Sequence, residues 1–246
     1  MNRLAAALLI ALSTAVAAPV PAQEDAAPPK EVGVDDKAIM TSQGFLSAHP
    51  DLGNRLQGLD SLENKNFKRA LDDFRRAARY GDKPSQGVIA EMYWNGQGVE
   101  ADRATAYAWM DLAAERAYPS FVAFRERYWS ALTPAERERA TTVGEPLYAE
   151  YGDAVAKPRM ERVLRKRRMH ITGSHAGYVN GAMQVVVQDG NSERGRNIPA
   201  FRFYQPRYWL PRNYYEWQDE IFERPANGIV EIGPIGTPEA AGGPDE

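Results

Sequence analysis

The sequence contains no cysteine and only three histidines among its 246 residues. Without cysteine there are no disulfides and no lipid attachment to an N-terminal cysteine, so packing alone must stabilise the fold. His170 and His175 have no acid beside them, which makes a poor metal site. Ser174 lacks the Gly-x-Ser-x-Gly frame of a hydrolase nucleophile. We therefore expect no enzyme activity, no metal and no other cofactor.

Long hydrophobic runs are also scarce, and the one at the N-terminus is short. "MNRLAAALLIALSTAVAAPVPAQED" opens with Arg3, continues with an apolar run over 4–18 and then offers small residues at 20–22. This pattern is typical of a secretory signal peptide, and the run is too short to span a bilayer comfortably. We predict a signal peptide over 1–22, cleaved after Ala22, and a periplasmic or secreted mature protein. A retained amphipathic anchor is the alternative.

Hydrophobic periodicity is missing from two further stretches. Residues 23–36 are acidic and proline-rich, and the tail "GPIGTPEAAGGPDE" has a similar composition. Such segments cannot bury enough apolar surface to offset the entropy of ordering. We therefore expect a flexible linker over 23–48 and a disordered tail over 233–246.

The middle of the chain contains an internal repeat. "PSQGVIAEMYW" at 84–94 aligns with "PSFVAFRERYW" at 119–129 at a shift of 35. Just upstream, the two copies match at a shift of 36 through Ala70, Phe74, Ala77 and Ala78 and through Ala106, Met110, Ala113 and Ala114. A length difference of one residue explains the two shifts. A period of this size indicates a solenoid of stacked helix pairs.

The spacing within each copy is helical. Ala106, Trp109, Met110, Ala113 and Ala117 form one apolar stripe. Asp102 can cap the helix that carries the stripe, and Pro84 and Pro119 suit the first turn of the helix that begins each copy.

"NGQG" at 95–98 raises the question of a phosphate-binding loop. Such a loop follows a strand and carries Lys with Ser or Thr after its glycines, and neither is present here. Gly96 fits the left-handed residue that ends a helix, and Gly98 provides a second bend. The stretch is therefore predicted to be a turn between two helices.

These residues together carry a resemblance. Tyr93-x-x-Gly96-x-Gly98-Val99-x-x-Asp102-x-x-x-Ala106-x-x-Trp109-x-x-x-Ala113-Ala114 resembles the signature of the Sel-one-like repeat (SLR), an α/α solenoid family related to tetratricopeptide repeats. The resemblance implies a mainly α fold and a helical-repeat domain over 49–156. It also implies a scaffold or adaptor for protein partners without catalytic residues.

The full signature occurs once, and the neighbouring units are less regular. Residues 66–82 resemble the second helix of a preceding unit, with 52–62 as its partner, and 119–150 resemble a degenerate closing unit. The family usually has glycine where Ala117 stands. One helix pair cannot bury its own stripe, so Trp109, Phe74 and Tyr93 are expected in the core, with direct ligand contact as the alternative.

The composition changes after residue 156. Over 157–232 we expect a basic and aromatic segment with short strands, at 182–191 and 227–233, that form a small β ribbon. "KPRMERVLRKRRMH" contains Arg165, Lys166 and Arg168, which we consider candidates for binding an acidic partner or anionic lipid headgroups. Export argues against nucleic acid as a partner. The alternative is a solvated helix end, with cations near the negative end of the helix dipole.

Aromatic residues gather in "FRFYQPRYWLPRNYYEWQDEIF" at 201–222. Tyr208 and Trp209 are candidate anchors for a protein partner or a glycan, because such rings are enriched at binding hot spots and stack on sugars. The alternative is that these rings pack the segment onto the solenoid.

The leading hypothesis is an exported, non-catalytic helical-repeat scaffold or adaptor that mediates protein–protein interaction in the bacterial envelope. The second hypothesis is an envelope module that binds glycan or peptidoglycan through the aromatic segment. A hydrolase comes third, because no constellation of carboxylates or Ser and His reads as catalytic.

Overall fold

The computed structural model describes residues 34–169, 183–187 and 195–223. The chain divides into two units, Met1–Val32 and Gly33–Glu246, and every described residue belongs to the second unit. The expected signal peptide, the tail over 233–246, the strand at 227–233 and the group His170, Ser174 and His175 lie outside the described residues.

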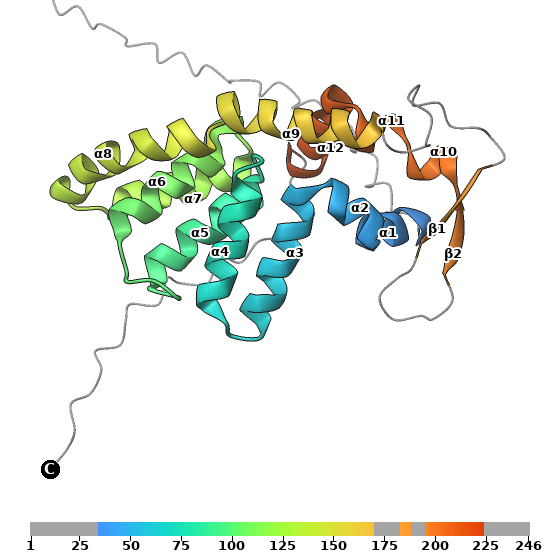
Figure 1. Ribbon diagram of the computed structural model, residues 1–246. Coiled ribbons are helices and arrows are strands. Elements are labelled where there is room, and N and C mark those ends of the chain that lie inside the picture. The colour runs from blue at the N-terminus through green and yellow to red at the C-terminus, as the bar shows by residue number, and fades with distance from the viewer. Residues whose placement is uncertain (1–33, 170–182, 188–194, 224–246) are drawn as a thin grey trace, which may run out of the picture. The chain divides into compact units, whose positions relative to one another are not determined.

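Consecutive helices form antiparallel pairs (Figure 1). α3 (Pro50–Glu63) packs with α4 (Phe67–Ala78), and α5 (Lys83–Asn95) packs with α6 (Arg103–Ala113). α4 packs on α5, and α7 (Pro119–Ala131) and α8 (Pro134–Tyr151) both pack on α6, so the helices form one continuous stack. This arrangement confirms the predicted mainly α fold of stacked helix pairs.

Capping residues set where these helices begin. The carboxylates of Asp82 and Asp102 accept hydrogen bonds from the backbone N–H groups of Ser85 and Thr105. Thr133 forms a reciprocal capping box with Glu136 at the start of α8. Pro84 and Pro119 occupy the first turns of α5 and α7, as the sequence predicts, because an N–H is dispensable there.

The turn at "NGQG" has the predicted conformation. Gly96 ends α5 in the left-handed region at φ 69°, and Gly98 follows at φ 73°. A Cβ on Gly98 would lie 2.6 Å from the backbone carbonyl carbon of Phe67, at the start of α4. Glycine at 98 is therefore required both for its backbone conformation and for the close approach of two turns.

The apolar stripe lies in the core of the stacked pairs. Trp109 is 2% exposed and its ring lies 4.7 Å from that of Tyr151, while Phe74 is fully buried between α3 and α4. Tyr93 is half-buried at the edge of this core, where its hydroxyl accepts a hydrogen bond from Arg75. The prediction that Trp109 and Phe74 are core residues is confirmed.

The length difference between the two repeat copies corresponds to one buried residue. Gly81 and Ala117 both have positive φ, at 80° and 57°, and stand at equivalent positions before Pro84 and Pro119 in the first turns of α5 and α7. Between these landmarks the first copy has one more residue, Lys83, which is 1% exposed. The insertion therefore places an ammonium group inside the molecule.

Two helices precede the repeats. α1 (Val34–Thr41) and α2 (Gln43–Ala48) bury Ile39 and Phe45 completely. The expected flexible linker is therefore wrong over 34–48, because these apolar side chains find partners in the C-terminal part of the chain.

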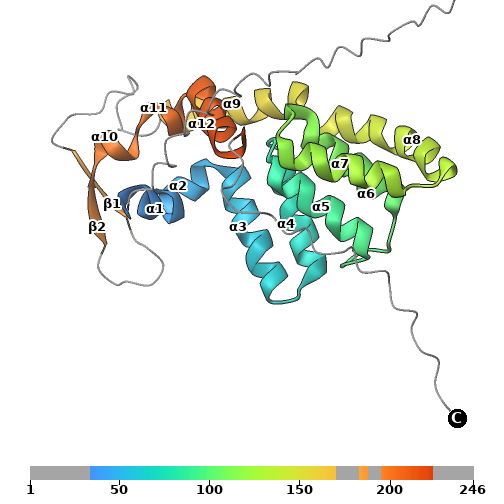
Figure 2. The same cartoon turned by 180° about the vertical axis from the view of Figure 1, so that it is seen from behind.

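The domain boundary expected after residue 156 is also wrong. α9 (Asp153–Met169) runs through it without a break and buries Met160 and Leu164. In both views α8 and α9 follow one another along the same side of the helix pairs (Figure 2).

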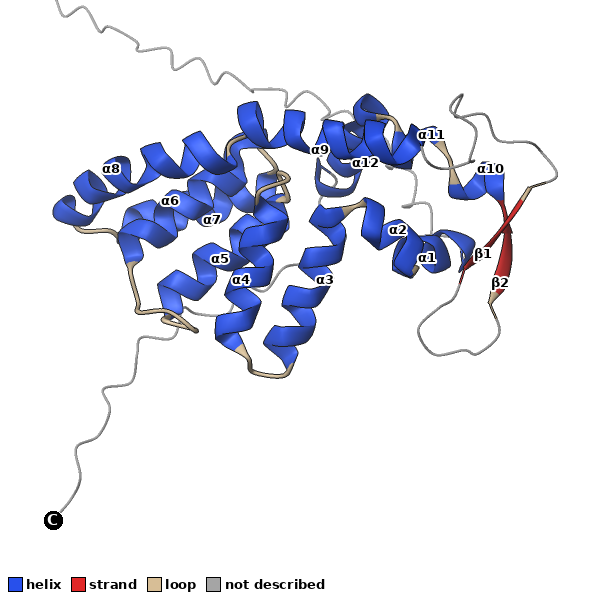
Figure 3. Cartoon of the chain, viewed as in Figure 1, coloured by secondary structure: helices blue, strands red, loops and turns tan. Residues whose placement is uncertain are grey.

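A small sheet and three helices complete the described chain. β1 (Gln184–Val187) pairs antiparallel with β2 (Arg196–Pro199), with Val185 opposite Ile198. β1 lies within the strand predicted at 182–191, whereas β2 was not foreseen. α10 (Ala200–Phe203), α11 (Pro206–Trp209) and α12 (Pro211–Glu223) follow, so helices dominate this segment too (Figure 3).

Candidate partner-binding surfaces

Tyr208 and Trp209 form part of a second core. They are 1% and 4% exposed and pack with Phe45, Leu52 and Phe203 from α2, α3 and α10. Their interpretation as exposed anchors is therefore wrong. The alternative, that the rings pack this segment onto the solenoid, holds in part, because they pack on the start of α3 and otherwise on the helices before the repeats.

Polar contacts fix the same two side chains. Trp209 Nε1 donates to the Phe203 carbonyl at 2.7 Å, and the Tyr208 hydroxyl donates to the Asp36 carboxylate at 3.2 Å. A ring nitrogen of His49 lies 2.8 Å from the Tyr208 carbonyl. The segment is thus held by hydrogen bonds as well as by apolar contact.

The residues of the repeat signature have structural positions. Ala106, Trp109, Ala113 and Ala114 are buried, Tyr93 and Val99 are half-buried, and Gly96 and Gly98 form the turn.

Asp102 has a second contact besides its cap. Arg139 of α8 donates to its carboxylate at 2.6 Å. Partial burial opposes ionisation, but hydrogen bonds from Arg139 and Thr105 hold the pKa of Asp102 below its usual range. The signature acid therefore joins the start of α6 to α8.

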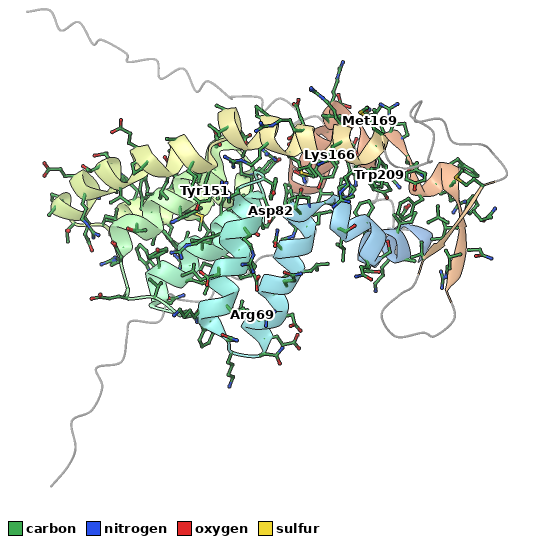
Figure 4. All side chains as sticks on the ribbon, viewed as in Figure 1. Arg69, Asp82, Tyr151, Lys166, Met169 and Trp209 are labelled. Carbon is green, nitrogen blue, oxygen red and sulfur yellow. The ribbon has the colours of Figure 1, made fainter. Side chains whose placement is uncertain are left out.

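The cations predicted at 165, 166 and 168 lie at the exposed end of α9. Arg165, Lys166 and Arg168 are all exposed, and Arg165 donates to Glu161 one turn earlier at 2.6 Å. Figure 4 shows Lys166 and Met169 at this end of the helix. Cations here also interact favourably with the carbonyl end of the helix dipole, so exposure alone does not assign them a binding role.

A groove adjoins this helix end. It has a volume of about 480 Å³ and is lined by Ser47, Pro50, Tyr80, Val163, Lys166 and Arg167, and we call it the basic groove. Arg167 donates to the Ser47 carbonyl at 3.0 Å, which ties α9 to α2. Lys166 was a candidate from the sequence. Tyr80, Val163 and Arg167 were missed, because the groove joins segments that are distant along the chain.

A second groove lies on α3 and was not foreseen. Its volume is about 620 Å³, and its lining is Thr41, Gln43, Leu46, Ser47, Gly53, Leu56, Gln57, Asp60 and Arg69. Leu56 is 42% exposed, and the neighbouring Leu59 is 44% exposed. Leu52, Leu56 and Leu59 fall at i, i+4 and i+7 and form one apolar stripe of α3, so the sequence did not indicate that Leu56 and Leu59 would be exposed while Leu52 is buried.

Buried charges join α9 to the repeats. Lys83 lies 2.7 Å from Glu115 and 3.2 Å from Asp153, and Arg116 donates to Asp153 at 2.7 Å. Burial lowers the pKa of Lys83, and Asp153 acts in the opposite direction. Burial also opposes ionisation of Asp153, but Arg116 and Lys83 hold its pKa well below the usual range.

A second buried polar group joins α12 to α3. Asp51 accepts hydrogen bonds from the Tyr214 hydroxyl at 2.5 Å and from Gln218 at 3.2 Å, while its Oδ1 atom has no hydrogen-bond partner among the residues that the structure describes. Burial, with Asp51 nearby, raises the pKa of Tyr214, and burial lowers that of His49. Perturbed pKa values often mark active sites, but neither groove is lined by these groups. We interpret them as structural joints.

Within residues 34–169, 183–187 and 195–223, no three His, Asp or Glu side chains are grouped as metal ligands. None of the helices described there has the length and apolar character needed to cross a bilayer.

Comparison with known proteins adds little. No family model and no curated protein matches the chain. Among solved structures, it is similar to a protective antigen present in uropathogenic Escherichia coli strains that displays an SLR fold. The two share 22% identity with a TM-score of 0.40, over 58% of this chain and 27% of the antigen. The matched region thus spans about a quarter of the antigen's length.

Proposed function

We propose that this chain is an exported helical-repeat scaffold that binds a protein partner in the bacterial envelope. The observation that carries the proposal is the exposed cationic end of α9, which adjoins an open groove on a framework of stacked helix pairs. Surfaces built across several helices suit the recognition of other proteins. The export part rests on the sequence of residues 1–22.

The resemblance to Sel-one-like repeats supports the same function. The signature residues pack the core and form the turn of the solenoid. A partner would therefore contact exposed side chains outside the signature. The glycan alternative loses its proposed surface, because Tyr208 and Trp209 are buried and cannot stack on a sugar.

The test is capture of the partner by the mature protein from its own envelope fraction, with identification by mass spectrometry. A variant carrying Arg165→Ser, Lys166→Ser and Arg168→Ser should retain the fold, since all three side chains are exposed. With an acidic partner, this variant should associate more slowly and with a weaker salt dependence, because electrostatic steering is reduced.

A truncation after residue 156 is unsuitable as a test, because it would remove Met160 and Leu164 from the core. Capture of no specific partner by the wild type would contradict the proposed function. Equal capture by the wild type and the triple variant would be consistent with a scaffold whose partner binds another surface. The groove on α3 would then be the next candidate.

A further inference from the structure

We infer that the basic groove binds an acidic peptide segment that inserts one apolar side chain between α9 and the start of α3. This inference rests on the proposed function and specifies the partner's chemistry.

The lining of the groove comes from three places in the chain. Val163, Lys166 and Arg167 lie on α9, Ser47 and Pro50 lie where α2 meets α3, and Tyr80 follows α4. The positions of the first two are set by the fold, because Arg167 is hydrogen-bonded to Ser47. A ligand therefore meets a preformed site and loses little affinity to reorganisation.

Apolar groups form the floor. Tyr80 and Val163 are half-buried and pack against a small core of Met160, Leu164 and Tyr214. The groove volume of about 480 Å³ is enough for an apolar side chain and the adjoining backbone of a peptide. Burial of such a side chain on this floor would provide the hydrophobic part of the affinity.

The charge on the rim is of one sign. Lys166 and Arg167 are the charged residues of the lining, which contains no acid. Within the described residues, one hydrogen bond of the Arg167 guanidinium is found, to Ser47, so its other N–H groups can bind a carboxylate.

The surroundings add to this field. Arg162, Arg165 and Arg168 are exposed on the same stretch of helix and extend the positive potential outward, where it would attract an acidic segment. The acid on this stretch, Glu161, is paired with Arg165.

A concave site favours a peptide over a bilayer. A flat layer of anionic headgroups would meet the outward side chains, such as Arg162, Arg165 and Met169, which is 57% exposed. It would not reach the floor formed by Tyr80 and Val163. An extended peptide can place a carboxylate on the rim and an apolar side chain on the floor at the same time.

The experiment measures binding of fluorescent peptides to the full mature chain by anisotropy. The probe is a short glutamate-rich peptide with one central leucine, and its two controls carry glutamine for glutamate or serine for that leucine. We expect the probe to bind more tightly than both controls. Lys166→Glu with Arg167→Glu should weaken the binding about tenfold or more, because the contact becomes repulsive.

The matched control variant is Lys68→Glu with Arg212→Glu, which changes net charge equally at exposed sites on α4 and α12. Arg212 is 90% exposed. It should bind the probe like the wild type, and Lys166→Gln with Arg167→Gln serves as a second groove variant with less risk to the fold. Circular dichroism and thermal melting verify folding of all variants.

Three outcomes overturn the inference. The first is equal affinity for the probe and the glutamine peptide. The second is equal weakening by the groove variant and the control variant. The third is binding to vesicles of anionic phosphatidylglycerol, lost in the groove variant, with no binding of the probe. If the native partner is still captured in any of these cases, the scaffold function stands and only its assignment to the groove fails.

Discussion

The repeat region, α3 to α8, and the segment from α9 to α12 are both helical, yet they bury their aromatic side chains in different ways. In the repeats, partners come from neighbouring helix pairs, as Trp94 stacks on Tyr128. In the C-terminal segment, partners come from the far end of the described chain, as Tyr208 meets Asp36 and Tyr214 meets Asp51. The repeat region is thus held by contacts between neighbouring helices, and the C-terminal segment by contacts with the first helices of the described chain.

The difference has a physical reason. A solenoid leaves its terminal pairs with open faces, and these must be covered for stability. Here α1, α2, the small sheet and α10 to α11 form a joint core with Leu52 of α3, which covers the start of the first pair. The aromatic segment is therefore best understood as the cap of the solenoid.

Removal of a large ring from each region tests this comparison most strongly. Trp109→Ala and Trp209→Ala should each lower the free energy of unfolding by about 3–5 kcal/mol, because each empties a buried site. Chemical denaturation followed by circular dichroism measures both. If Trp209→Ala changes nothing while Trp109→Ala destabilises, the C-terminal segment is not part of the cooperative fold.

The sequence predicts the repeat region far better than the cap. Gly96, Asp102 and Trp109 could be assigned because turn, cap and stripe are local patterns that act within one or two helices. The burial of Tyr208 could not be predicted, since its partners on α1 and α2 lie more than 150 residues away along the chain. For the basic groove, the cations are visible in the sequence but the floor is not, because Tyr80 and Val163 meet only in the fold.

The joint between the two regions depends on Asp153. Asp153→Asn leaves Lys83 and Arg116 without this carboxylate, so we expect the free energy of unfolding to fall by about 3 kcal/mol near neutral pH. The pKa of Asp153 is lower in the fold than in the unfolded chain. Its ionisation therefore stabilises the fold above the unfolded pKa of about 3.9, and this stabilisation is lost as the pH falls below that value. The variant should thus flatten the decline of stability in acid, as measured by urea unfolding at a series of pH values.

Asp82 provides the opposite case within the same molecule. Burial raises the pKa of Asp82 in the fold. Its protonated carboxyl group therefore contributes fully to the free energy of unfolding below about pH 4, and this contribution is lost as the pH rises through the pKa of the folded state. Asp82→Asn keeps a capping side chain for α5 and should make stability rise more steeply with pH than in the wild type. Equal pH dependence for the two variants would show that these carboxylates do not differ in environment.

The turn inside the repeats should tolerate change at one glycine better than at the other. Gly98→Ala forces a Cβ against the Phe67 backbone in addition to its positive φ, and we expect a loss of about 2 kcal/mol or more. Gly96→Ala meets its nearest neighbour at 3.4 Å, so about 1 kcal/mol of backbone strain remains. Thermal melting compares the two, and equal losses would mean that the contact with α4 relaxes freely.

The smallest effect should appear where this chain departs from the usual repeat. Ala117 adopts φ 57°, a left-handed conformation that costs an L-residue about 1–2 kcal/mol, while its equivalent in the preceding copy is Gly81. Ala117→Gly removes that strain but gives the unfolded chain more freedom, so we expect a net gain of about 0.5–1 kcal/mol. Gly81→Ala should act in the opposite direction, because its Cβ would also lie 3.1 Å from the Arg116 guanidinium. Differential scanning calorimetry should show a melting temperature about 1–4 °C higher for Ala117→Gly. A lower value would mean that the alanine is favoured there by a contact other than its backbone conformation.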